Sequence, residues 1–168
     1  TELFGHWWWE GVDWIEEVMR QVAKRDDIRM VTPSHLLKDW DRLAEAQVFE
    51  SSWGVGGKHF GWCNPETSWM WDTISKAREE YNSIAHFAGG DMLLQTIKQA
   101  EKELMLMESS DWFFMVTNNH TRDYAMKRFF NHYAKLMRLT DMVKSDRFDT
   151  ESVQWLRGVQ KEDQLFNI

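Results

Sequence analysis

Tryptophan is the residue type in this chain whose pattern points most directly to chemistry. The 168 residues include 11 Trp, several of them clustered, and Trp53 and Trp62 lie on either side of a glycine-rich stretch at residues 54–57. That stretch has neither a helical nor a strand period. A flat indole can cover the C–H face of a sugar ring at small conformational cost. The pattern therefore predicts a sugar-binding loop; an aromatic-rich core or a flexible connector are the alternatives.

The histidines and the single cysteine show no spacing typical of a metal centre or a nucleophile. Cys63 cannot form a disulfide within the chain. His132 lies on an apolar stripe, which predicts a core histidine rather than a ligand. Four further histidines lack the close HxxxH or CxxC spacing of zinc sites: His6, His35, His59 and His86. We therefore expect neither a metal nor another cofactor.

Charge and hydropathy exclude two classes of partner. The chain carries 27 Asp and Glu against 20 Lys and Arg, a net charge of -7, whereas a nucleic-acid-binding surface needs clustered basic residues. The longest apolar run, Trp112–Val116, is far too short to span a bilayer. A single cysteine fits a reducing compartment. We expect no nucleic-acid or membrane partner and a cytoplasmic location.

The elements that position these candidate residues are expected to be helices. The chain has only two Pro, and apolar residues recur at helical spacing along most of its length. The expected fold class is mainly α, a helical bundle with one or two short strands, near residues 28–32 and 46–49. Alternating charges from Lys98 to Glu103 predict a solvated helix face. Helices are expected at residues 10–25, 34–39, 65–88, 93–107, 125–139 and 150–160.

Three stretches, in order along the chain, resemble glycoside hydrolase family 57. The first is Thr1–Gly11, TELFGHWWWEG, which is similar to the end of the fourth signature motif of that family. The second runs from Glu50 through the glycine-rich stretch to Pro65. The third combines Ser110–Trp112 with Arg122–Ala125, and it is similar to the helical C-terminal region of the family, beyond its incomplete (β/α) barrel.

The resemblance implies an activity on α-1,4-glucan. Members of the family carry out a retaining double displacement with a Glu nucleophile and an Asp acid/base. The branching type, which forms α-1,6 links by transglycosylation, is favoured here by the SSWG loop and the long helical tail. A 4-α-glucanotransferase or an α-amylase of the same family is the first alternative. A non-catalytic glucan-binding or structural helical module is an alternative of another class.

The resemblance places no catalytic residue in this chain. It implies an acid/base Asp immediately before Thr1 and a nucleophile Glu in an N-terminal barrel, so the chain alone is expected to be inactive. It also implies contacts with α-1,4-glucan from aromatic and neighbouring polar side chains. The substrate-binding candidates are Trp53, Trp62, His6, Trp7, Asp111 and Trp112, the last two having a helix-capping Asp and a buried Trp as their structural alternatives.

Three segments follow from these assignments. Residues 1–32 are expected to complete the catalytic barrel, residues 33–65 to form the aromatic substrate loop region, and residues 66–168 to form the C-terminal helical domain. The expected partners are the glucan itself and the N-terminal barrel portion of the parent chain. Apolar residues at 3–9 and 28–31 are expected to lie against that barrel.

Overall fold

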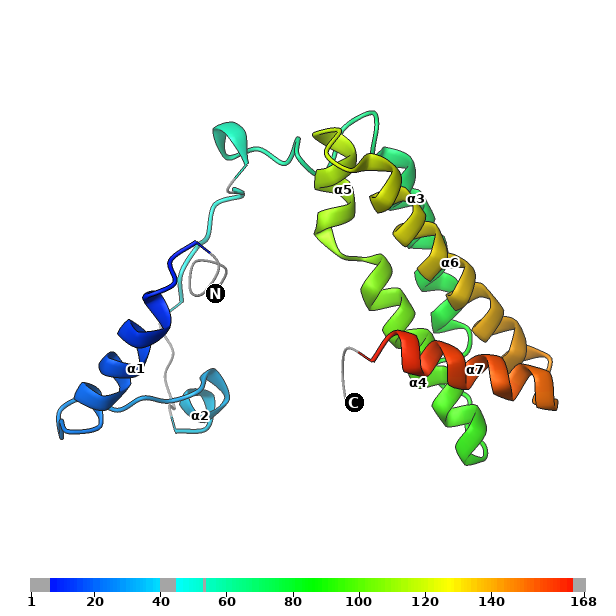
Figure 1. Ribbon diagram of the computed structural model, residues 1–168, viewed down its shortest axis with the longest axis horizontal. Coiled ribbons are helices and arrows are strands. Elements are labelled where there is room, and N and C mark those ends of the chain that lie inside the picture. The colour runs from blue at the N-terminus through cyan, green and yellow to red at the C-terminus, as the bar shows by residue number, and fades with distance from the viewer. Residues whose placement is uncertain (1–6, 40–44, 53, 165–168) are drawn as a thin grey trace. The chain divides into compact units, whose positions relative to one another are not determined.

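A computed structural model describes residues 7–39, 45–52 and 54–164 of the chain. The fold consists of two compact units, residues 1–49 and residues 50–168. Each unit has its own elements, which Figure 1 labels in chain order. In the described residues, no helix is long and apolar enough to cross a membrane.

The first unit contains two helices, α1 (Gly11–Val22) and α2 (Pro33–Asp39). Neither predicted strand forms, because residues 28–32 and 46–49 have no strand pairing. A strand needs a neighbour for its backbone N–H and C=O groups, and no described segment of this unit supplies one. The apolar side chains of Ile28 and Met30 stay 44% and 57% exposed.

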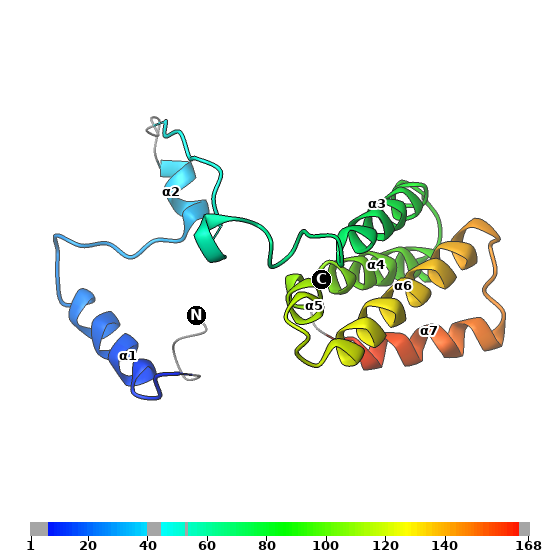
Figure 2. The same cartoon turned by 90° about the horizontal axis from the view of Figure 1, so that it is seen from above.

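The second unit is a helical bundle, as the apolar stripes predicted. It comprises α3 (Ser68–Asn82), α4 (Asp91–Met107), α5 (Ser110–Thr117), α6 (Arg122–Lys144) and α7 (Thr150–Glu162). Helix α4 packs along α6, α3 packs against both, and α5 covers one end of α6. After a short turn, α7 folds back against α4 and α6 (Figures 1 and 2).

The predicted stripes supply most of the core of this bundle, and Phe113 adds to it from α5, a helix that no stripe had predicted. Burial of large apolar side chains is the main favourable term in such packing. Aromatic rings make an edge-to-face contact within this core, where the ring centroids of Phe113 and Phe129 lie 6.3 Å apart. The largest fully buried apolar side chains come from α3, α4, α5, α6, α7 and the turn after α3: Met70, Ile74, Ile84, Met107, Phe113, Phe129, Leu136, Leu139 and Leu156.

Helix α3 begins later and ends earlier than its sequence predicted. Asn64 does not cap a helix that starts at Pro65; its Oδ1 accepts from the Glu66 N–H at 2.8 Å and closes a separate turn. The helix starts only at Ser68. It ends at Asn82, and turns rather than helix continue from there to residue 86.

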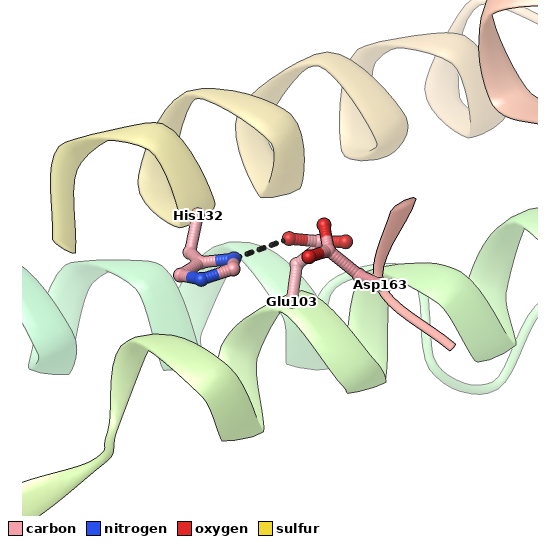
Figure 3. A group of neighbouring side chains, drawn as sticks. All are labelled: Glu103, His132 and Asp163. Carbon is pink, nitrogen blue, oxygen red and sulfur yellow. Dashed lines mark hydrogen bonds and ion pairs between the residues drawn. The ribbon is translucent and has the colours of Figure 1, made fainter. Parts of the chain in front are cut away.

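One predicted solvated residue is buried. Glu103 was expected on an exposed face of α4, but its side chain is fully buried, and it contacts His132 of α6 with 2.7 Å between Oε2 and Nδ1 (Figure 3). Gln99 donates to the other Glu103 oxygen at 2.8 Å. Charge alternation could not reveal this, because the partner lies on another helix. His132 is a core histidine, as predicted.

Asp163, at the end of α7, completes a buried ionic cluster. Its Oδ2 accepts from Lys135 Nζ at 2.6 Å, and Glu162 Oε1 lies 3.1 Å from the same nitrogen. Burial alone would raise the pKa of Asp163, but the hydrogen bond and charge of Lys135 outweigh burial and hold that pKa below its usual range. Burial would likewise lower the pKa of Lys135, and its bonds to Asp163 and Glu162 reverse that effect and raise it.

These shifts predict a pH window for stability. The Asp163 contribution is present above the unfolded pKa of about 3.9 and is lost as the pH falls through the lowered folded value. The Lys135 contribution is present below about 10.4 and is lost as the pH rises through the raised folded value. The cluster therefore stabilises the bundle most between roughly pH 4 and pH 10.

We expect Asp163→Asn to lower the free energy of unfolding at pH 7 by about 2 kcal/mol, because Lys135 loses its charged partner and keeps only Glu162. The loss of stability between pH 5 and pH 3 should become shallower. Chemical denaturation at several pH values measures both effects. Asp72→Asn, at an exposed site on α3, is the matched control. Equal stability of the two variants would contradict the assignment.

Candidate functional site

The glycine-rich loop folds as a compact hydrogen-bonded turn. Ser52 N–H donates to the Gly57 carbonyl at 3.1 Å, and the Ser52 hydroxyl donates to the Lys58 carbonyl at 2.6 Å. A short 3₁₀ turn, η1 (Val55–Gly57), closes the loop. Gly56 and Gly57 have φ values of 65° and 69°, a left-handed conformation that favours glycine. The described residues of the loop therefore form a hydrogen-bonded turn that their glycines make possible.

Gly54 is required for another reason, which is close approach. A Cβ at this position would lie 2.5 Å from the Lys58 carbonyl oxygen and 3.1 Å from the Trp62 ring. Only a residue without a side chain lets the loop lie against the Trp62 indole. The glycine-rich sequence thus positions one of the predicted sugar-binding residues.

Asn64 and Thr67 anchor the segment after Trp62. The Asn64 amide donates to the Phe60 carbonyl and to the Thr117 hydroxyl of α5, each at 2.8 Å. The Thr67 hydroxyl donates to the Trp62 carbonyl at 3.0 Å. Both anchoring side chains are buried. Buried hydrogen bonds of this kind hold the Trp62 backbone in a fixed position relative to α3 and α5.

An open pocket of about 320 Å³ lies where the loop meets α3, α4 and α5. Its lining residues are Ser52, Trp62, Trp71, Glu108 and Ser110. The Trp71 indole N–H donates to the Trp62 carbonyl at 2.9 Å, and its ring stacks on Phe113 with centroids 4.4 Å apart. Trp71 is still 39% exposed, so part of its surface faces the solvent.

The lining groups suit a neutral sugar. Two indoles offer flat apolar surface, and the Ser110 hydroxyl can donate and accept. The Ser52 hydroxyl already donates to the Lys58 carbonyl, so it can offer a ligand only an acceptor. Glu108 Oε1 lies 2.5 Å from Arg78 Nε, which fixes the carboxylate and leaves its second oxygen as an acceptor. An anion would meet the Glu108 charge. The volume falls at the small end of ligand pockets, which start at about 300 Å³.

The structure brings one of the six predicted site residues into this pocket, namely Trp62. Trp53 and His6 lie outside the described residues. Trp7 belongs to the first unit, where its side chain is 72% exposed. Asp111 is exposed on the first turn of α5. Their roles towards glucan stay predictions.

The sixth predicted residue, Trp112, has structural contacts. It is half-buried against the core, and its indole N–H donates to the Leu106 carbonyl at 2.8 Å. Sequence reasoning missed Trp71 and Glu108. A signal for Trp71 was available, because it stands off the apolar stripe of Met70 and Ile74 on the same helix. Glu108 could not be found in this way, because its place depends on how α4 meets the loop.

The Glu103, His132 and Asp163 cluster offers metal-type ligand atoms, all within 4.8 Å of one another. However, the Lys135 ammonium already contacts Asp163 at 2.6 Å, and a divalent cation would be repelled by it. Glu103 and His132 are fully buried. The donor set therefore fits an internal ion network, with no path for a substrate to reach it.

We expect Gly54→Ala to destabilise the loop by about 1–3 kcal/mol, because its new Cβ meets backbone that cannot rotate away. Hydrogen exchange at the Ser52 and Gly57 amides should accelerate. Gly61→Ala, in the same segment, is the control, because its Cβ would meet only the Phe114 ring at an ordinary 3.7 Å. Unchanged exchange in Gly54→Ala would refute the close-approach argument.

Comparison with known proteins places this arrangement in a larger context. The chain is 34% identical over 99% of its length to a 1,4-alpha-glucan branching enzyme of Thermococcus kodakarensis, and it covers 25% of that protein. It is 29% identical to a probable 1,4-alpha-glucan branching enzyme of Mycobacterium tuberculosis, of which it covers 33%. The chain thus spans a quarter to a third of the length of these relatives.

Solved structures agree with the sequence relatives. The crystal structure of a GH57-type branching enzyme from Pyrococcus horikoshii matches 99% of this chain and 32% of its own, with a TM-score of 0.70 and 32% identity. The alpha-amylase AmyC from Thermotoga maritima matches with a TM-score of 0.60 and 29% identity, over 99% of this chain and 30% of its own.

The sequence family described as the C-terminal region of 1,4-alpha-glucan branching enzymes matches residues 73–168, which is more than half of the chain. These residues include all of α4, α5, α6 and α7 and most of α3. The chain therefore belongs to the family of 1,4-alpha-glucan branching enzyme C-terminal regions, within glycoside hydrolase family 57.

Proposed function

We propose that this chain is the substrate-shaping C-terminal part of a family 57 branching enzyme. In this role the Trp62 and Trp71 pocket holds an α-1,4-glucan segment, and a barrel elsewhere in a longer protein supplies the catalytic carboxylates. The observation that carries the proposal is the pocket itself, in which two indoles, two hydroxyls and one fixed carboxylate open onto the same space. The relatives are 1,4-alpha-glucan branching enzymes, which agrees with the proposal.

The carboxylates of the described residues support the absence of catalysis in the chain alone. A retaining glycosidase needs two carboxyl groups about 5–5.5 Å apart on either side of the glycosidic bond. Glu108 is the one carboxylate among the residues that line the pocket, and Arg78 pairs with it. Glu103 and Asp163 lie close together, but they are buried in the ionic cluster where no sugar can reach them.

Exposed apolar side chains on the first unit support a barrel partner. Val12 and Met19 on α1 are at least half exposed, at 56% and 50%, and Val31 in the following segment is 38% exposed. Apolar surface of this kind is typical of a region that is covered in a larger assembly. The segment is the one whose motif resembles the end of the catalytic barrel.

A hydrolytic role is the second candidate, favoured by the structural match to the alpha-amylase of Thermotoga maritima. Whether a glycosyl-enzyme passes its sugar to water or to another glucan depends on water exclusion and on which hydroxyl can enter. The loop at residues 51–62 bears on both. The ratio of branching to hydrolysis in the longer protein separates the two candidates.

We expect the purified 168-residue chain to turn over no amylose, because the Trp62 pocket of the described residues is lined by one carboxylate, Glu108, rather than by the pair that the reaction needs. Release of reducing sugar and formation of α-1,6 links are the two measurements. The longer protein, prepared in the same way, is the positive control. Turnover by the isolated chain that survives repeated purification would place the chemistry in this region after all.

In the longer protein, we expect Trp62→Ala and Trp71→Ala each to slow branching by about tenfold, since loss of a stacking contact of roughly 1 kcal/mol or more raises the barrier accordingly. Hydrolysis should fall less, because the indoles position an acceptor sugar and keep water away. Branching and hydrolysis rates, measured separately, give the ratio that decides the matter.

Trp69→Ala is the matched control for these variants. Trp69 lies on the same helix, and its indole N–H also donates to a backbone carbonyl, that of Glu66 at 2.8 Å, but it stacks on Phe130 and does not line the pocket. It should lower the melting temperature and leave the branching-to-hydrolysis ratio unchanged. If all three variants change stability and leave that ratio constant, the tryptophans only support the fold.

A further inference from the structure

A second hollow lies between α6 and α7, and it has a composition unlike the core. It measures about 560 Å³, within the range of small-molecule sites. Asn131, Ala134 and Arg138 line it from α6, and Trp155, Gly158 and Glu162 line it from α7. We call this the α6–α7 groove. None of these residues lines the Trp62 pocket.

Two small residues open the groove. Ala134 and Gly158 are both exposed and lie midway along the lining stretches of their helices. Glycine in a helix interior lowers stability relative to alanine, and here no packing reason requires it, because an added Cβ would meet nothing within 4 Å. The helix thus gives up stability at the place where a side chain would fill the groove.

The walls at one end are an indole and a guanidinium. Arg138 lies over the Trp155 ring, with its Cζ 4.1 Å from the ring centroid. Within the described residues, no carboxylate lies within ion-pair distance of Arg138, so its N–H donors remain available to a ligand. Stacking on the indole holds the guanidinium flat without using those donors.

Donors and acceptors both line the groove. Asn131 offers an amide that can donate and accept, and Glu162 offers a carboxylate whose Oε1 lies 3.1 Å from Lys135 Nζ. Asn131 and Arg138 are two helical turns apart, which gives a groove about 10 Å long. Lys135 also lines the groove, but its charge is already paired with Glu162 and Asp163. A polyhydroxyl ligand can both donate to Glu162 and accept from Arg138, which an anion cannot do.

We propose that the α6–α7 groove is a second carbohydrate-binding site, which holds a short stretch of α-1,4-linked glucose away from the Trp62 pocket. The choice of glucan rests on the proposed function, while the sugar-binding character rests on the groove itself. The partly buried Trp155 contacts a sugar ring, and Arg138, Asn131 and Glu162 bind its hydroxyls. Such a site keeps a long polymer near the enzyme without taking part in the reaction.

The test is a titration of the 168-residue chain with maltotriose, followed by the Trp155 indole N–H signal in a nitrogen-edited NMR spectrum. The signal should move saturably. Gly158→Leu should weaken this binding at least about tenfold, because leucine fills the groove and favours the helix. Gln154→Leu, which places the same side chain on an exposed part of α7 outside the groove, should leave the titration unchanged.

Two further arms make the outcome decisive. Arg138→Ala should also weaken binding, and it tests the groove without adding bulk. Titration with inorganic phosphate should leave the Trp155 signal in place; a response to phosphate and none to maltotriose would overturn the proposal. So would a maltotriose response of equal strength in Gly158→Leu, or no response in the unaltered chain.

The same titration separates this inference from the proposed function. Trp71→Ala should abolish any response of the Trp62 indole signal and leave the response of Trp155 intact. A response at Trp155 without one at Trp62 would argue against the proposed role of the Trp62 pocket and would support the groove. A response at Trp62 alone would support the Trp62 pocket and would overturn the proposal of a site in the α6–α7 groove.

Discussion

The helical unit depends on a buried contact in which Glu103, His132 and the Asp163–Lys135 ion pair meet at the junction of α4, α6 and α7. Removing charges from water is costly, and the cost is offset only when each charge keeps its partners. Each of the three helices, with the residue that ends α7, supplies at least one member of the cluster. A shift of any helix by one turn would therefore leave a buried charge without its partner. The cluster thereby fixes the helix register that non-directional apolar packing leaves open.

Contacts with the helical bundle hold the residues of the Trp62 pocket in place. The glycine-rich loop has its own hydrogen bonds, but its link to the helices runs through Asn64, Thr67 and the stacking of Trp71 on Phe113. Phe113 in turn is fully buried against Phe129 of α6. A loop that binds substrate usually lies on a rigid scaffold of this kind. The arrangement explains how the irregular backbone at Trp62 can hold its indole at a fixed separation from that of Trp71 on α3.

Periodicity predicted the bundle because apolar stripes report directly which helix face is buried. One or two short strands were also predicted, near residues 28–32 and 46–49, and these do not form, since no described segment pairs with either stretch. Periodicity missed Glu103 as a buried residue and Glu108 as a pocket residue, because each depends on a partner from a distant part of the chain, His132 and the Ser52 loop. The local spacing of apolar residues is enough to predict the fold class. Which polar residues stabilise the fold and which bind a ligand depends on their neighbours in the tertiary structure.

Helix α6 has polar residues of both kinds, some that stabilise the core and some that can bind a ligand. Its inward residue His132 has its Nδ1 against Glu103 within the core, whereas the outward Asn131 and Arg138 keep polar groups available to solvent or ligand. Lys135 belongs to both faces, since it lines the α6–α7 groove and holds Asp163 in the buried cluster. A ligand in the groove would therefore touch a side chain that the core already immobilises. Binding there needs little further ordering of the protein, which lowers its entropic cost.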